Sequence, residues 1–172
     1  MFRRVDDFKT IWQQEADKTL AVFAAIPDAA AHQAVDAQHR DLRRMAWHLV
    51  ETILELPQNL GLLVKGPAAL GPDGFIGAPP ATMAEIATAY RAVSDSLLDH
   101  IGSWSNTELG RSFTLYGENW TGAFSLYVLV NHQTHHRGQM TVLMRQAGLP
   151  VPSIYGPTRE GWAEFGLDAP KV

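Results

Sequence analysis

The sequence predicts an all-α protein, a four-helix bundle with a long crossover connection between the second and third helices. Three observations lead to this fold class. Four segments carry apolar residues at steps of three and four, which is the spacing of one helix face. Proline or glycine bounds these segments, and one connection is much longer than a turn between neighbouring antiparallel helices. Because each helix has one apolar stripe to bury, we expect a single domain over residues 1–172.

The first two helices are expected at residues 2–25 and 39–56. Pro27 follows the first and Pro57 follows the second, and proline is disfavoured inside a helix because it lacks an N–H group. The stripe residues are Val5, Phe8, Trp12, Ala16, Leu20 and Phe23 in the first helix, and Leu42, Met45, Leu49, Ile53 and Leu56 in the second.

The connection that follows, residues 57–81, is rich in proline and glycine and is therefore expected to be irregular. It is long enough to cross the bundle. The third helix is expected at residues 82–101, because Thr82 and Glu85 have the spacing of a capping box at a helix start. This spacing sets the start of the helix more sharply than the apolar pattern does.

A looser stretch, residues 102–117, contains a short extended piece at 113–116. The fourth and longest helix is expected at residues 118–147, ending before Gly148, since glycine commonly follows the last helical turn. Gly138 lies inside this helix, where glycine costs about 1 kcal/mol relative to alanine. We expect a close crossing with another helix at that position.

The segment after the fourth helix contains the aromatic residues Tyr155, Trp162 and Phe165 among prolines and glycines. Aromatic side chains contribute large buried areas when they pack. We therefore expect this tail to pack on the body of the protein.

Composition narrows the class of protein. The chain has no cysteine, which excludes disulfides, thiolate zinc sites and a cysteine nucleophile. Its formal net charge is −4 with no long basic run, which argues against nucleic-acid binding. No segment approaches the roughly 20 apolar residues that span a membrane, and the N-terminus does not have the apolar segment of a signal peptide. We expect a soluble cytoplasmic protein.

Three of the seven histidines lie together in the fourth helix. His132 and His136 fall about 40° apart on one helix face, the geometry by which one helix offers two imidazoles to one metal ion. His135 lies about 60° to the other side of His132 and competes with them. The alternative is a pair of core histidines held by ordinary hydrogen bonds, and the spacing by itself favours that alternative.

Two better-defined metal motifs do not fit. A zincin requires glutamate directly after the first histidine, where this chain has Gln133. A ferritin-like di-iron site requires histidine three residues after glutamate on two helices, and no glutamate here has that spacing. A third ligand must come from another helix. His48, at the margin of the second helix's stripe, either lines such a site or is a solvated edge residue.

The segments HQTHHRGQMTVLMRQAGLPVP, LRRMAWHLVET and IYGPTREGW, with YGENW before the fourth helix, resemble the DinB-like superfamily of metalloenzymes over nearly the whole chain. The resemblance implies the four-helix bundle with its crossover, often as a homodimer. It also implies a divalent metal ion held by His48, His132 and His136. Three imidazoles suit zinc or nickel and leave a coordination position open, as in catalytic sites.

The resemblance further implies a transferase acting on small molecules, with a low-molecular-weight thiol as cosubstrate. A metal site of this kind activates a bound thiol or water. Two alternatives stay open. One is a metal-binding stress-response protein without catalysis, and the other is a dimeric interaction module whose histidines belong to the core.

Five residues could support the site, each with a structural alternative. Glu51, three residues after His48, is the candidate catalytic base or an extra ligand, or else a solvated glutamate. Gln139 could orient a metal ligand or form an ordinary buried hydrogen bond. Arg137 could bind a substrate anion, but it points about 140° from His132 and is rather expected at the surface, an interface or the tail. Glu118 and Trp120 could border a pocket at the start of the fourth helix.

Overall fold

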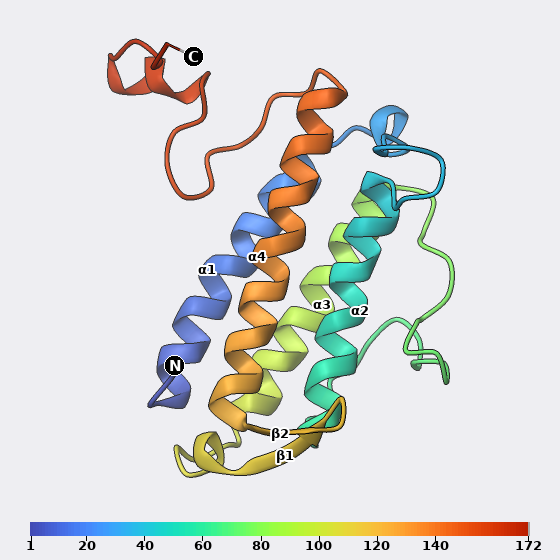
Figure 1. Ribbon diagram of the computed structural model, residues 1–172, viewed down its shortest axis with the longest axis vertical. Helices are drawn as coiled ribbons and strands as arrows, with labels where there is room; N and C mark the ends of the chain where they lie inside the picture. Colours follow the sequence, from blue (N-terminus) through green and yellow to red (C-terminus); the bar gives the residue numbers. More distant parts are fainter. Residues whose placement is uncertain (172) are drawn as a thin grey trace.

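The computed structural model describes residues 1–171 and contains four long helices and one antiparallel hairpin (Figure 1). The predicted helical character is confirmed, but the protein is not all-α because of the hairpin. The helices are α1 (Val5–Ala24), α2 (Leu42–Asn59), α3 (Met83–Ile101) and α4 (Gly122–Gln146), the strands are β1 (Ser112–Leu115) and β2 (Glu118–Thr121), and the short 3-10 helices are η1 (Asp28–Ala30), η2 (Glu108–Gly110) and η3 (Gly161–Phe165).

The connection between α2 and α3 returns the chain along the length of the helices, so that α2 and α3 run in the same direction (Figure 1). The backbone N–H of Met83, the first residue of α3, donates to Asp28 Oδ1 at 2.7 Å. The start of α3 therefore lies beside the end of α1. This path agrees with the expected crossover.

The core lies between the four helices, because α1 and α2 each pack against both α3 and α4. Phe8, Trp12, Ile53 and Leu97 are fully buried there. Each such side chain contributes about 1.5–3 kcal/mol through burial. The one polar atom of Trp12, its indole N–H, donates to Ser94 Oγ at 2.8 Å, so the ring is buried without an unsatisfied donor.

Local hydrogen bonds explain where two of the helices begin. The Asp41 side chain accepts from the Arg44 N–H at 2.7 Å, so α2 starts at Leu42 rather than at residue 39. The capping box predicted for α3 is confirmed, with Thr82 and Glu85 bonding each other's backbone N–H groups. Within residues 1–171, none of these helices combines the length and apolar composition needed to cross a membrane.

The predicted end of α2 was wrong, since the helix continues through Pro57 to Asn59. Proline removes the hydrogen bond to the carbonyl four residues earlier, and its ring crowds that carbonyl. Because only two helical residues follow it, the last turn tolerates this loss.

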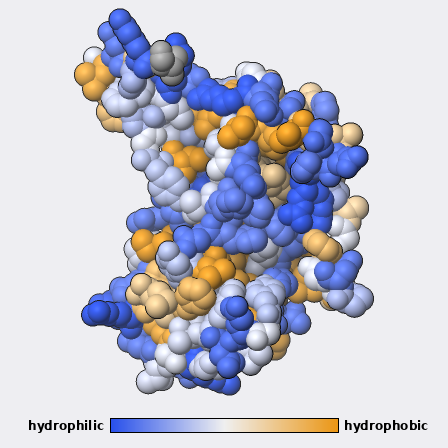
Figure 2. All heavy atoms as spheres, in the orientation of Figure 1, coloured by the Kyte–Doolittle hydropathy of each residue, from blue (hydrophilic) through white to orange (hydrophobic). Residues whose placement is uncertain are grey.

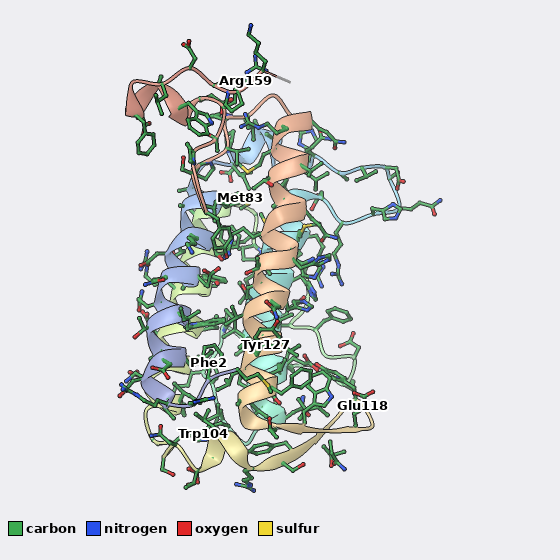
Figure 3. The ribbon with its side chains drawn as sticks, turned by 60° about the vertical axis from the view of Figure 1, so that its left-hand side comes forward. Phe2, Met83, Trp104, Glu118, Tyr127 and Arg159 are labelled. Carbon is green, nitrogen blue, oxygen red and sulfur yellow. The ribbon has the colours of Figure 1, made fainter. Side chains whose placement is uncertain are left out.

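The fourth helix begins four residues later than predicted, because residues 118–121 form β2. The extended piece expected at 113–116 is β1 and the start of the turn. Tyr116 (φ 52°) and Gly117 (φ 81°) both have positive φ, as a two-residue hairpin turn requires. Glu118 lies on this hairpin, before the start of α4 (Figure 3).

The tail leaves the end of α4 and extends past the helices (Figures 1 and 2). Phe165 is 66% exposed, so the expectation that its ring packs on the body was wrong. The short helix η3, which carries Phe165, lies beyond the end of the four long helices (Figure 1). The hydroxyl of Tyr155 does contact the body, at Glu15 and Arg137. Gly138 is exposed and an added Cβ would meet no atom, so no close helix crossing explains it.

Candidate metal site

His48 on α2 and His132 and His136 on α4 come together midway along the two helices, as predicted. The Nε2 atoms of His48 and His132 lie 3.1 Å apart. The ring of His136 is centred 4.8 Å from the ring of His48 and 4.5 Å from that of His132. One ring nitrogen of each histidine lies within 4.8 Å of the other two, so the three residues could hold one metal ion.

The spacing of the nitrogens suits a metal ion. Imidazole nitrogens bind zinc at about 2.0–2.1 Å, which places two of them about 3.3 Å apart on a tetrahedral ion. The 3.1 Å between His48 and His132 is close to this value. A hydrogen bond between those two rings would satisfy one proton and one lone pair but would leave His136 out, whereas a metal ion accepts a lone pair from each ring.

The remaining ring nitrogens face groups that would orient them. His136 Nδ1 lies 2.7 Å from Gln139 Oε1, so a proton on Nδ1 leaves Nε2 free to bind. His48 Nδ1 lies 3.6 Å from the Glu51 carboxylate and is buried without a hydrogen bond among the described residues. A carboxylate behind a metal-binding histidine fixes its tautomer and orientation. The expected supporting role of Gln139 fits its position.

Glu51 is buried, with only 1% of its surface exposed, so the alternative of a solvated glutamate was wrong. Arg44 donates to both of its oxygens, at 2.9–3.1 Å, and the Ile76 N–H donates to Oε1 at 3.3 Å. Burial raises the pKa of Glu51, but the adjacent His48 ring and the Arg44 guanidinium outweigh this effect and the pKa is lowered overall. The carboxylate is therefore ionised beside His48.

Burial also keeps His132 and His136 neutral. It lowers the pKa of both His132 and His136 to about 4, assisted by the neighbouring histidines and by Arg40, and the Gln139 hydrogen bond only partly opposes this at His136. A neutral imidazole has the free lone pair that a metal ligand needs. Both rings are therefore in the binding form at neutral pH.

His135 lies next to this cluster but outside it. Its ring is centred 5.0 Å from that of His136, and the side chain is exposed on the outer side of α4. Gln133, at the zincin glutamate position, is fully buried and points to α2 and α3, where it bonds Leu49 and Tyr90.

Arg137 is buried rather than at the surface, with 1% of its area exposed. It forms an ion pair with Glu15 of α1, and its Nη1 donates to Thr19 Oγ1 at 2.9 Å. Tyr155 of the tail covers this pair, which agrees with the expected tail contact. The opposite face of α4 is packed against α1, and Arg137 is paired there, away from the histidines.

Two cavities adjoin the histidine cluster. The first, of about 270 Å³, lies beside His48 and His132, and Glu51, Thr52, Glu55, Asp73, Gly74, Phe75 and Tyr116 complete its lining. The second, of about 500 Å³, lies beside His136. Glu118 and Trp120 line neither cavity. Both lie on β2, where the Trp120 indole N–H donates to Glu118 Oε2.

Tyr116 and Glu55 belong to the site but were not singled out from the sequence. The Tyr116 hydroxyl is 2.8 Å from both carboxylate oxygens of Glu55. A signal for Glu55 was present, because it lies seven residues after His48 and therefore on the same helix face. No local pattern places Tyr116 there, because the hairpin brings it to α2 from 61 residues away.

The fold and the site define a mostly helical protein with a three-histidine cluster that could hold a metal ion. The chain belongs to the DinB family, whose model matches residues 1–171. This finding confirms the resemblance noted in the sequence.

Known relatives agree with this assignment. The chain is 38% identical over 173 residues, all of both chains, to the uncharacterized protein YrdA of Bacillus subtilis (strain 168). It is similar to the crystal structure of a DinB-like protein from Bacillus cereus ATCC 10987, with 32% identity and a TM-score of 0.80, covering 90% of this chain and 100% of that one. The DinB-like protein YjoA of Bacillus subtilis shares the fold at 12% identity, with a TM-score of 0.67 and coverage of 88% and 99%.

Proposed function

We propose that this chain is a four-helix-bundle metalloenzyme in which His48, His132 and His136 hold one zinc or nickel ion. The observation that carries this proposal is the convergence of three imidazole nitrogens within 4.8 Å of one another, beside a cavity. Three imidazole ligands from two helices match catalytic metal sites, which keep a position open for a small molecule.

The reaction we propose is transfer to or from a low-molecular-weight thiol, with a small molecule as the second substrate. A bound metal ion would lower the pKa of a thiol or water and stabilise negative charge. Family membership supports the thiol, and the two cavities support small-molecule substrates, since the larger has the volume of a typical ligand pocket. Family membership also supports a homodimer, which light scattering after size-exclusion chromatography would test.

The residues around the histidines have distinct tasks in this proposal. Glu51 and Gln139 position the rings of His48 and His136 through the nitrogens that face away from the cluster. The lowered pKa of Glu51 makes it a weak proton acceptor, so we assign to it this positioning role ahead of the role of catalytic base. Glu55 and Tyr116 form the polar wall of the smaller cavity and are placed to contact a substrate.

The first experiment is elemental analysis of untagged protein beside a His132→Ala/His136→Ala variant. We expect about one divalent ion per chain in the parent and a loss of that ion in the variant. Absence of metal, even after incubation with zinc and nickel, would contradict the proposal and favour the interaction module.

The second experiment tests the thiol. Cobalt-substituted protein is titrated with glutathione and with cysteine while its visible absorption is recorded. A new thiolate-to-cobalt band is the expected result. If fully loaded protein shows no band with these or other small thiols, the thiol-transfer reaction is contradicted. The chain would then be a metal-binding protein without that reaction.

A further inference from the structure

The larger cavity at the cluster has a polar end and an apolar end. It lies between the loop before α2 and the second half of α4, and its volume of about 500 Å³ is in the range of small-molecule sites. Val35, Met45, Val142 and Leu143 form its apolar walls, and its polar lining residues are Gln38, His39, Arg40, His136 and Gln139.

Among the residues that line this cavity, Arg40 is the one that indicates an anionic ligand. The side chain is half-buried, and within residues 1–171 it forms neither an ion pair nor a hydrogen bond. Charged groups removed from water are normally paired. No carboxylate lines the cavity, and the nearby Asp36 is 2.6 Å from His39 Nδ1.

The other arginines near the cluster already have partners. Arg44 donates to Glu51, and Arg137 is paired with Glu15 on the far side of α4. The smaller cavity has the opposite character, since Glu51, Glu55 and Asp73 line it and no lysine or arginine does. An anionic ligand is therefore repelled from the smaller cavity and attracted to the larger one.

We propose that the larger cavity binds an organic carboxylate with an apolar body, its carboxylate at Arg40 and its body against Val35, Met45, Val142 and Leu143. Arginine suits this task because its planar guanidinium can donate two parallel hydrogen bonds to a carboxylate. The inference rests on the proposed function in one respect, which is that this ligand would be the second substrate of the metal site.

The test is calorimetric titration of the full chain with 4-phenylbutyrate, in zinc-loaded and in chelator-treated protein. The uncharged 4-phenylbutyramide and the cationic 4-phenylbutylamine are the matched probes. Arg40→Gln removes the proposed partner, and Arg91→Gln changes an exposed arginine on α3 as the control. Val142→Asp places a negative charge on an exposed wall of the cavity, so the fold is not at risk.

We expect the carboxylate to bind more tightly than the amide or the amine. Loss of charged hydrogen bonds should weaken its binding about tenfold or more in Arg40→Gln. Val142→Asp should weaken it as well, whereas Arg91→Gln should not. Binding of the amide should be the same in the parent and in Arg40→Gln.

Equal carboxylate affinity in the parent and in Arg40→Gln would overturn the inference, as would tighter binding of the amine. Metal content of each sample is measured in parallel. Protein that holds zinc but shows no dependence on Arg40 refutes the carboxylate site alone. Protein that binds no zinc refutes the proposed function, and the chelator-treated titration still decides whether Arg40 binds the carboxylate.

Discussion

The side-chain amide of Gln133 donates to the backbone carbonyl of Leu49 at 3.0 Å, and each of these residues directly follows a histidine of the cluster. The bond joins α4 to α2 one residue away from His132 and from His48. It therefore fixes how the two helices are aligned at the level of the candidate site. Gln133 also donates to Thr52 and accepts from the Tyr90 hydroxyl, which links α3 to the same point.

Replacing Gln133 should destabilise the fold. Gln133→Leu leaves the Tyr90 hydroxyl without its acceptor in the core, while the Leu49 carbonyl still accepts from the Thr52 hydroxyl. An unsatisfied buried polar group costs about 1–3 kcal/mol. We expect the free energy of unfolding in urea to fall by about 2 kcal/mol. Gln146→Leu, at the exposed end of α4, is the control and should change it by less than about 0.5 kcal/mol. Equal effects of the two substitutions would show that the buried amide does not join the helices.

The carboxylate behind His48 should control metal affinity. Glu51→Gln keeps the shape of the side chain but removes its charge, and loss of such a partner typically lowers metal affinity about 10–100-fold. Competition with a chromogenic zinc chelator measures this change. Glu55→Gln is the matched control, since Glu55 lines the same cavity but bonds Tyr116 instead of a histidine. Parent-like zinc affinity in Glu51→Gln would show that Glu51 does not position His48.

The buried ion pair between Glu15 and Arg137 should matter far more than an exposed pair. Arg137→Met leaves the Glu15 carboxylate with only the half-buried Lys18 as an ion-pair partner, and loss of a buried partner costs up to about 3–5 kcal/mol. The exposed pair of Arg145 and Glu160 offers a control, and Arg145→Met should cost about 1 kcal/mol or less. Chemical denaturation measures both. The double variant Glu15→Gln/Arg137→Met should recover part of the loss, and a double variant less stable than either single variant would contradict this account.

Stability should fall in acid because of Glu15. Burial raises the pKa of Glu15, but hydrogen bonds from Lys18, Tyr155 and Arg137 lower it by a larger amount. The folded pKa therefore lies below the ordinary value of 4.5. A carboxyl with a lowered folded pKa stabilises the protein above its unfolded pKa. This contribution is lost as the pH falls from about 4.5 through the folded value.

The comparison that isolates this effect is Glu15→Gln against the parent, with the free energy of unfolding measured from pH 7 to pH 3. The difference between the two proteins should be constant above about pH 5 and should shrink below about pH 4.5. A difference that stays constant down to pH 3 would show that Glu15 is not the titrating group.

Most of the helical structure could be predicted because its causes are local. The apolar spacing of α1 and the Thr82–Glu85 capping box depend on residues within one or two turns of each other. The errors fall where a neighbour from elsewhere in the chain intervenes. The start of α4 was predicted four residues early, because β2 pairs with β1 and withdraws residues 118–121 from the helix.

In the candidate site, too, local features could be predicted, whereas contacts between distant residues could not. The sequence by itself determined that His132 and His136 share a helix face, since that follows from the period of the helix. It also determined that a third ligand must come from another helix, and the family motifs pointed to His48. The facing positions of α2 and α4 then bring the three rings together.

Only the tertiary structure decided which arginine is buried in an ion pair and which one lines a cavity. Arg137, the anion-binding candidate by its place in the motif, is paired with Glu15, while Arg40 faces the cavity beside His136. The physical reason is that α4 packs against α1 on one side and α2 on the other, so both of its faces are partly buried. A residue's angle on its own helix gives its direction, and what it meets there depends on helices and loops distant in the chain.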